Sequence, residues 1–302
     1  MGQPFLTVGN EGLPQGTIQK AVTGQEGATS ERFSKTRSLM EALVAPLSDA
    51  DATIQSMEDA SPAKWHLAHT TWFWETFLLR DHAPGYALYD QDWPFLFNSY
   101  YEAEGARLGR FSRGMLSRPT LEEIGEWRAH VTRAMEPLLD NPAHADLIEL
   151  GIAHEQQHIE LLLTDIKHAL FQNPLGVAMW EGGNIGVAAP ETGWHQHPGG
   201  MAQIGHSGDG FAFDNEGPVH RALLEPFALA ESLITNREWD EFVEDGGYET
   251  PSLWLSDGLA WVRENQITAP LYWQKGEHFT HQGWQPRDPN ACLLYTSDAA
   301  DD

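Results

Sequence analysis

The sequence contains a single cysteine, Cys292, and no long apolar run among its 302 residues. One cysteine excludes an internal disulfide framework and a structural zinc site built on cysteines. Without a run of about 18 apolar residues, no membrane-spanning helix is expected. The first residues, MGQPFLTVGNEG, also lack the charged and apolar regions of a signal peptide. These absences predict a cytoplasmic protein with no membrane partner.

Positive charge is scarce as well. The chain has 18 Lys and Arg residues against 44 Asp and Glu residues, which gives a formal net charge of -26. Such a chain repels nucleic-acid phosphates unless its basic residues form a concentrated patch, and the sequence shows none. We therefore expect no nucleic-acid partner. Small polar or zwitterionic ligands are compatible with this charge.

The first half of the sequence predicts a bundle of four helices. Ser61 and Pro62 resemble an N-cap followed by proline at the first helical position, and Thr120 with Glu123 forms a capping box. Apolar residues recur at helical spacing in four segments, residues 30–46, 61–79, 120–139 and 147–171. Residues 1–30 are rich in Gly, Gln and Thr, which predicts a flexible arm.

The connection over residues 81–118 is far longer than a usual loop within a bundle. Its aromatic residues favour an ordered loop, and its arginines make it the one locally basic stretch of the chain. Arg110 and Arg113 lie beside the aromatic cluster. They either solvate a surface or hold a ligand carboxylate by bidentate pairing, and both interpretations remain open.

After Pro174 the helical pattern gives way to glycines, prolines, tryptophans and short apolar runs. This composition predicts a second, irregular α+β domain, with a strand at residues 219–224 and a short helix at 238–244. The final segment, ACLLYTSDAADD (291–302), fits neither domain and resembles the translated read-through of a sequencing adapter. We expect this segment to be a non-native tail that packs against nothing in particular, and the natural chain to continue past about Ala291.

Two histidines on the fourth predicted helix form the most informative pattern. His154 and His158 are one helical turn apart, so their rings project from one face. This face also carries the arc that a bundle would bury, Leu147, Gly151, Leu161 and Leu162. Two imidazoles in a buried arc require either a metal or hydrogen-bond partners among the core residues.

A third ligand would come from a facing helix. On the second predicted helix, His69 shares a buried arc with Trp65 and Trp72, so it is the better ligand. His66 lies at the edge of this arc, where it would support a ligand or take part in packing. Three neutral imidazoles with open coordination positions suit iron, zinc, nickel or copper.

The letters HEQQH (154–158) also match the H-E-x-x-H motif of zinc peptidases, in which the glutamate is the general base. The extended form with a third histidine is missing, and a downstream ligand such as Glu181 would have to come from a loop. Glu155 lies about 100° around the helix from His154, so it can equally be a surface carboxylate or one that supports a ligand.

Three segments of the first half carry a family resemblance: SPAKWHLAHTTWFWETFLL (61–79), NSYYEAEGARLGRFSRGMLSRPT (98–120) and GIAHEQQHIELLLTDIKH (151–168). They resemble the iron-dependent sulfoxide synthases of ergothioneine biosynthesis. Residues 198–221 and 226–258 look like a formylglycine-generating-enzyme (sulfatase-modifying-factor) domain. The resemblance implies an α+β chain: a DinB-like four-helix bundle (31–176), then an incomplete, C-type-lectin-like domain (177–290).

The resemblance also implies roles for residues at matching positions. Fe(II) would be bound by His69, His154 and His158. The carboxylates of the sulfur donor would be bound by Arg110 and Arg113, and the histidine betaine would be contacted by Gln157. The implied reaction uses O2 to join cysteine or γ-glutamylcysteine to hercynine (N-alpha-trimethylhistidine) as a sulfoxide.

The resemblance places the family's catalytic tyrosine beyond the end of this chain, so we expect the chain as written to be poorly active. A domain cut partway should also expose apolar surface around four tryptophans, Trp254, Trp261, Trp273 and Trp284. Two alternatives use the same three histidines: a zinc or nickel thiol transferase of the DinB type, and a metal or thiol binder without redox chemistry.

Overall fold

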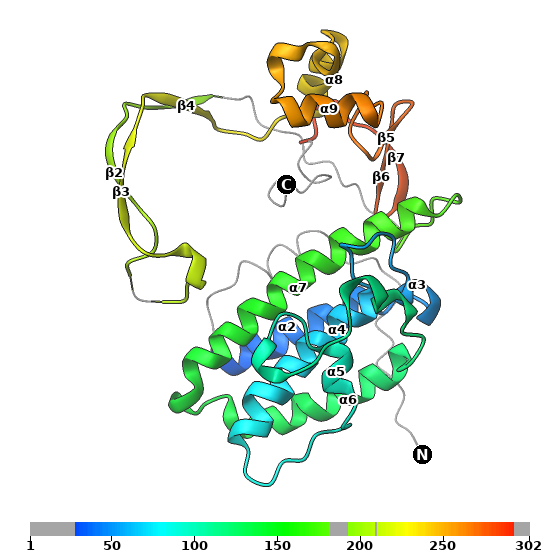
Figure 1. The fold of residues 1–302 in the computed structure, drawn as a ribbon, viewed down its shortest axis with the longest axis vertical. Helices are drawn as coiled ribbons and strands as arrows, with labels where there is room; N and C mark the ends of the chain where they lie inside the picture. Colours follow the sequence, from blue (N-terminus) through cyan, green and yellow to red (C-terminus); the bar gives the residue numbers. More distant parts are fainter. Residues whose placement is uncertain (1–27, 182–192, 209, 293–302) are drawn as a thin grey trace. The chain divides into compact units, whose positions relative to one another are not determined.

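The structure is a computed structural model, and it describes residues 28–181, 193–208 and 210–292. The chain forms two compact units, residues 1–183 and 184–302, which are treated separately below (Figure 1). The first unit is helical and the second mixes strands with short helices, so the expected α+β class is confirmed. Within the described ranges, no helix has the length and apolar character needed to cross a membrane.

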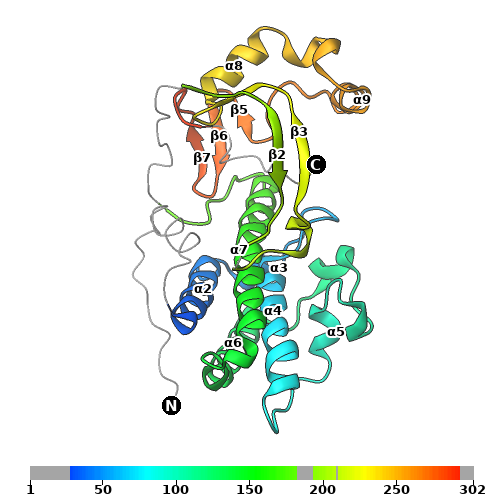
Figure 2. The ribbon, with the colours of Figure 1, turned by 90° about the vertical axis from the view of Figure 1, so that its left-hand side faces the viewer.

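Four helices form the bundle of the first unit: α2 (Thr29–Val44), α4 (Ala63–Phe73), α6 (Leu121–Met135) and α7 (Ala145–Gln172). Helix α4 packs against the other three, as Figure 1 and Figure 2 show, and all of its residues are buried. The four predicted helices are confirmed. Of the expected arm, Thr29 and Ser30 are helical because they form the first turn of α2, and residues 1–27 lie outside the described part.

The helix starts show one confirmed and one wrong prediction. Thr120 and Glu123 form the predicted capping box of α6. Ser61 does not cap α4, because Pro62 itself takes the N-cap position with an extended backbone (φ -59°, ψ 147°). Ser61 instead donates its backbone N–H to Asp165 of α7, at 2.7 Å. This contact ties the beginning of α4 to α7.

Beyond Phe73, α4 continues as a π-helix, η1 (Trp74–Arg80). The carboxylate of Glu75 in this segment is buried and accepts hydrogen bonds from the Tyr86 hydroxyl and the Tyr89 backbone N–H, at 2.6 and 2.9 Å. Glu75 therefore anchors the beginning of the long connection to the bundle. The short helix α3 (Asp49–Thr53) lies before α4.

The long connection is ordered, as its aromatic residues predicted. It contains α5 (Trp93–Phe97) and the 3-10 helices η2 (Glu102–Glu104) and η3 (Arg110–Met115). The Trp93 ring meets Trp127 of α6 edge to face at 5.0 Å, and Trp65 of α4 donates its indole N–H to the Leu96 carbonyl at 3.2 Å. These contacts hold α5 beside α4. Two further 3-10 helices, η4 (Glu136–Leu138) and η5 (Pro142–His144), precede α7.

The strands of the second unit pair in three antiparallel groups. Strand β1 (Trp194–His197) pairs with β4 (Phe227–Ala230), and β2 (Gly200–Ile204) pairs with β3 (His220–Leu224). A three-stranded sheet contains β5 (Trp273–Gln274), β6 (Glu277–Thr280) and β7 (Gly283–Pro286). The predicted strand at 219–224 is thus β3.

The helices of this unit are α8 (Asn236–Glu244) and α9 (Ser256–Glu264), with the 3-10 helices η6 (Asp214–Glu216), η7 (Gly247–Glu249) and η8 (Pro251–Leu253). Helix α8 includes the predicted 238–244 segment and begins earlier, because Thr235 and Glu238 form a capping box. Helix α9 was not predicted.

The expectation that residues 291–302 pack against nothing is wrong for the first two of them. The Ala291 carbonyl accepts the Asn236 backbone N–H at 2.9 Å, and Ala291 is buried. Cys292 forms an isolated bridge with Thr235. The start of α8 provides these partners, because its first backbone groups need acceptors outside the helix. Residues 293–302 lie outside the described part.

Of the four tryptophans expected on exposed apolar surface, Trp261 is 56% exposed. The other three indoles are half-buried because each has a neighbour that covers it, but apolar surface beside Trp254 is exposed as expected, since Leu253 is 60% and Leu255 87% exposed. Trp254 donates to the Gly247 carbonyl, Trp273 lies under the Arg287 guanidinium, and Trp284 packs against Phe279.

Candidate metal centre

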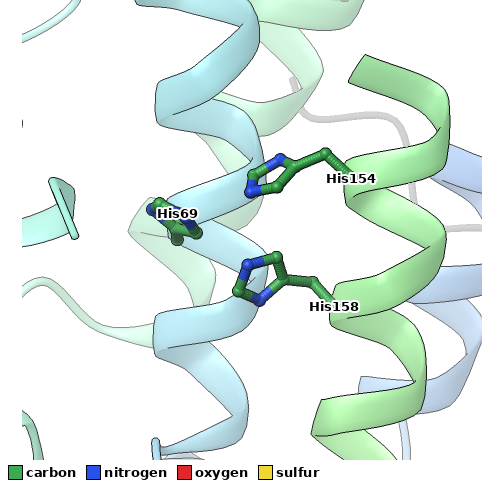
Figure 3. Close-up of side chains that lie close together, drawn as sticks. All are labelled: His69, His154 and His158. Carbon is green, nitrogen blue, oxygen red and sulfur yellow. The ribbon is translucent and has the colours of Figure 1, made fainter. Parts of the chain in front are cut away.

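The bundle brings His69 of α4 together with His154 and His158 of α7. Each ring offers one nitrogen, and the three nitrogens lie within 4.8 Å of one another. The ring centroids are 4.6 to 5.0 Å apart. Figure 3 shows the three rings pointing toward one another between the two helices. The predicted convergence is therefore seen in the structure, with His69 and not His66 as the third member.

Close packing of α4 and its π-helical extension against α7 positions these rings. Gly151, one turn before His154, faces the Trp74 indole, and a Cβ at Gly151 would come within 2.5 Å of this ring. A side chain there would push α7 away from the π-helix. Glycine at this position therefore permits the short separation that lets histidines from both elements meet.

The ring of His69 is held on both faces and at one nitrogen. Trp65 stacks on it at 4.6 Å with an interplanar angle of 12°, and Trp72 stacks at 5.3 Å and 14°. Its Nδ1 lies 2.6 Å from the Phe97 carbonyl oxygen. Because a carbonyl only accepts, Nδ1 carries the proton and Nε2 has a free lone pair. The ordered connection thus selects the nitrogen that His69 can offer to a metal.

Burial favours the neutral form of all three imidazoles. It lowers the pKa of His69 and of His158 well below the ordinary value, and a neighbouring imidazole acts in the same direction for each. Burial also lowers the pKa of His154 to about 4. At neutral pH all three rings are therefore uncharged, which is the form that binds metals.

The residues fit a divalent transition metal. Three neutral imidazoles from two rigid helices leave coordination positions open for substrates. The Nδ1 of His154 is buried and has no hydrogen-bond partner within the described residues, so the protein does not satisfy all the polar atoms of the centre by itself. Spacing and donor type alone do not distinguish iron from zinc, nickel or copper.

His66 supports the centre without joining the triad. It is buried, with Nδ1 2.9 Å from Nδ1 of His158 and Nε2 2.9 Å from a carboxylate oxygen of Asp165. The sequence placed His66 at the edge of the arc, as a supporting or packing residue, which agrees with this position. Asp165 was missed, although it lies seven residues after His158 and thus two helical turns along the same face.

Glu155 is not a surface carboxylate. It is fully buried, and its carboxylate pairs with Arg128 and with Arg37 (3.2 Å) and accepts the Trp74 indole N–H at 2.8 Å. Burial by itself would raise the pKa of Glu155, but the two guanidinium groups lower it to about 2.

A carboxylate engaged in this way cannot serve as the general base of a zinc peptidase, because its oxygens already accept from Arg37, Arg128 and Trp74. The structure therefore gives no support to the peptidase interpretation of HEQQH. Sequence reasoning missed both arginines. The available signal was their position among apolar residues at helical spacing, Phe33, Arg37 and Met40 in α2, and Ile124, Arg128 and Val131 in α6.

The two loop arginines occupy different environments. Arg113 is buried, with its guanidinium carbon 3.4 Å from the Trp65 ring centroid, and it donates to the hydroxyls of Ser61 (2.8 Å) and Ser99 (3.2 Å). Burial, assisted by nearby Arg110, lowers its pKa to about 10. Arg110 is more exposed and lies 4.0 Å from the carboxylate of Asp59.

The Trp65 indole lies between Arg113 and His69, so only this ring separates Arg113 from the metal centre. The Nε of Arg113 is buried without a partner within the described residues. Gln157 has an exposed side chain on α7, one residue before His158. Of the six predicted site residues, the structure gathers the three histidines into one cluster and places Arg113 close by, while Gln157 and Arg110 face solvent to a larger extent.

Comparison with known proteins matches the two parts of the chain to two described domains and the chain to three curated relatives. Residues 32–162 match the DinB superfamily, and residues 191–300 match the sulfatase-modifying factor enzyme 1-like domain. The chain is 30% identical over 240 residues to a hercynine oxygenase of Mycolicibacterium smegmatis, covering 74% of this chain and 52% of that protein.

Two further relatives carry the same name. The hercynine oxygenase of Mycolicibacterium thermoresistibile is 29% identical over 230 residues (74% of this chain, 50% of the relative). The hercynine oxygenase of Mycobacterium tuberculosis is 28% identical over 236 residues (76% and 53%). The chain thus spans about half the length of the curated relatives it matches.

Proposed function

We propose that the chain is a member of the hercynine oxygenase family and that its three-histidine centre holds Fe(II) for an oxygen-dependent reaction that joins a thiol to hercynine. The observation that carries the proposal is the convergence of His69, His154 and His158 as buried, neutral rings. The relatives named hercynine oxygenase suggest the reaction class, and the three imidazoles offer ligands for the metal.

The proposed reaction replaces the C2 hydrogen of the hercynine imidazole by the sulfur of cysteine or γ-glutamylcysteine and oxidises that sulfur to a sulfoxide. One atom of O2 ends in the sulfoxide and the other in water, which takes up the C2 hydrogen and the thiol hydrogen. When bound, Fe(II) supplies the oxidising chemistry and lowers the pKa of a coordinated thiol. The protein binds and orients the two organic substrates.

Arg113 is the residue best suited to hold a carboxylate of the thiol donor. Its described partners, Ser61 and Ser99, are neutral hydroxyls, so its buried positive charge has no anion bonded to it. A buried charge without a counter-charge is costly, and a substrate carboxylate would relieve this cost. Arg110, three residues earlier and more exposed, would contact a second carboxylate, which γ-glutamylcysteine carries in addition to that of cysteine.

Gln157 is proposed to contact hercynine. Its exposed amide lies next to His158 in the sequence, and an amide can both donate to and accept from a polar ligand. The assignment is tested by Gln157→Leu, which keeps a side chain of similar size without its polar groups. We expect a higher KM for hercynine with little change in the KM for the thiol.

Anaerobic purification followed by metal analysis tests the proposal directly. We expect one Fe(II) per chain, and O2 uptake that requires hercynine and a thiol. The sulfoxide is sought by mass spectrometry with protein and substrates at equal concentrations. His69→Ala should abolish metal binding and product. His168→Ala is the matched control, since His168 also lies on the bundle and contacts Ser56 instead of the centre.

The two alternatives predict a different outcome of the same experiment. Tight zinc or nickel binding by the three histidines, without O2 uptake, would overturn the oxygenase proposal and favour a thiol transferase or a non-redox binder. Adding cysteine or γ-glutamylcysteine together with an electrophilic acceptor such as 1-chloro-2,4-dinitrobenzene to the metal-loaded protein then distinguishes these two. A transferase joins the thiol sulfur to the acceptor and releases chloride faster than the uncatalysed reaction, while a binder does not accelerate it.

A further inference from the structure

A hydrogen-bonded chain of three side chains runs from a carboxylate to one of the metal ligands. A carboxylate oxygen of Asp165 lies 2.9 Å from Nε2 of His66, and Nδ1 of His66 lies 2.9 Å from Nδ1 of His158. The rings of His66 and His158 are buried, and the Asp165 side chain is 12% exposed. His66 is the link because it contacts both other residues while remaining outside the three-histidine cluster.

The chemistry of the first contact fixes the direction of the second. An ionised carboxylate can only accept, so the proton of His66 is on Nε2 and points to Asp165. A His66 that carries this single proton offers a lone pair at Nδ1. The contact between the two rings requires one proton, which must come from Nδ1 of His158. Nε2 of His158 is consequently the nitrogen with a free lone pair.

The carboxylate at the end of this chain is itself held in place. The same Asp165 oxygen that accepts from His66 also accepts the backbone N–H of Ser61 at 2.7 Å. Ser61 lies just before α4 and Asp165 lies on α7, so this oxygen joins the two helices that supply the metal ligands. The position of the acceptor is set by backbone packing and not by a mobile surface contact.

We propose that Asp165 and His66 are positioning residues that keep the proton of His158 on Nδ1 and so present its Nε2 to the metal. The inference rests on the three-histidine metal site of the proposed function, and is independent of the oxidation and of the substrates. His69 reaches the same state by another route, because the Phe97 carbonyl accepts its Nδ1 proton. His69 and His158 therefore both carry the ring proton on Nδ1, on the side away from the metal, although the acceptors of the two protons differ.

Two pairs of substitutions separate this role from packing. His66→Phe keeps a ring but removes the acceptor for His158, whereas His66→Asn places an amide oxygen near the original Nδ1. Asp165→Ala removes the final acceptor, whereas Asp165→Asn keeps an oxygen that can accept from both Ser61 and His66. His168→Phe is the control, because it makes the same change on α7 at a histidine that contacts Ser56 and Gln172.

The first readout is the affinity of the metal-free protein for Co(II), followed by its visible absorption. We expect His66→Phe and Asp165→Ala to weaken cobalt binding by about 10- to 100-fold, and the two Asn variants and His168→Phe to remain within about threefold of the unsubstituted protein. Circular dichroism of each metal-free variant checks folding. Asp165→Ala keeps the test decisive if His66→Phe does not fold, because it leaves the rings of the centre in place.

The second readout needs no metal. In the metal-free protein labelled with 15N at histidine, two-bond proton–nitrogen correlations show which nitrogen of His158 carries the proton. We expect Nδ1 in the unsubstituted protein and in His66→Asn, and a mixture of both tautomers in His66→Phe. A proton on Nε2 of His158 in the unsubstituted protein would overturn the inference.

The possible failures are distinguishable. Equal cobalt affinity of folded His66→Phe, folded Asp165→Ala and the unsubstituted protein would overturn the positioning role and leave the metal centre standing. Absence of cobalt binding by the unsubstituted protein would overturn the metal centre and, with it, this role, even where the correlations place the His158 proton on Nδ1.

Discussion

The bundle and the second unit differ in how completely each covers its apolar side chains. Every residue of α4 is buried, whereas the register partners Met201 and Leu223 on β2 and β3 are 65% and 71% exposed. Among the described residues after position 193, the buried apolar side chains are Val262, Phe279 and Ala291. All three candidate metal ligands come from the unit with the closed core. The three histidines, whose relative positions must be accurate to bind a metal, thus lie in the unit where packing fixes the side chains.

The largest expected effect tests whether the closed core depends on its buried charges. Glu155→Ala removes the buried carboxylate that Arg37 and Arg128 share, which leaves Arg37 without an ion-pair partner among the described residues and Arg128 with Glu41 only. It should destabilise the bundle by about 3–5 kcal/mol. Urea unfolding followed by circular dichroism measures the loss. In hydrogen exchange, peptides of α2 and α7 should lose protection while peptides of β6 and β7 keep theirs.

Glu149→Ala is the matched control on the same helix. Glu149 pairs with Arg32 at 2.5 Å, with side chains 26% and 13% exposed, so water compensates its loss in part. If Glu155→Ala were no more destabilising than Glu149→Ala, the buried charges would not stabilise this core as described.

Acid should destabilise the metal-free bundle by a smaller amount than Glu155→Ala. Burial lowers the pKa of His154 from 6.5 to about 4, so between these values the unfolded chain binds a proton that the folded chain does not. Stability of the metal-free bundle is therefore complete above pH 6.5 and falls as the pH drops toward 4. At about pH 5 the loss due to His154 is roughly 2 kcal/mol.

Urea unfolding of the metal-free protein, at neutral pH and at about pH 5, measures this loss. His154→Gln should show a shallower dependence on pH, because its amide does not titrate. An equally steep dependence in that variant would assign the acid sensitivity to other groups of the bundle.

The smallest effect is expected in the second unit. Asp240 of α8 pairs with Arg287 at 2.8 Å, and the two side chains are 36% and 16% exposed. Asp240→Ala should therefore cost no more than about 1 kcal/mol. Cobalt affinity of the three-histidine centre should not change. A marked loss of metal binding in this variant would contradict the assignment of all metal ligands to the bundle.

The sequence predicted the elements whose signals are local. Helix α7 follows from a long apolar period, and α6 from its capping box, because a helix start depends on groups a few residues apart. The choice of His69 over His66 followed from helical angles alone. The pairing of three histidines across two helices was predictable because His69, His154 and His158 lie in the arcs through which the two helices were expected to face each other.

Contacts between distant helices were not predictable in this way. The partners of Glu155 lie on α2 and α6, and those of Arg113 lie before α4 and after α5, so no local pattern identifies them. For Ser61 the local signal was misleading, because a tertiary contact with Asp165 replaced the expected cap. The substrate roles of Arg110, Arg113 and Gln157 stay predictions.

The stacked environment of His69 has a kinetic consequence. With Trp65 and Trp72 stacked on it and the Phe97 carbonyl at Nδ1, the ring cannot turn over unless both indoles move aside and the hydrogen bond to Phe97 breaks. The His69 ring is therefore already oriented when an ion arrives, and the rate of metal binding depends on access to the centre and not on a ring rotation. The same restraint slows escape, because a bound ion cannot leave by the stepwise swinging aside of this ligand.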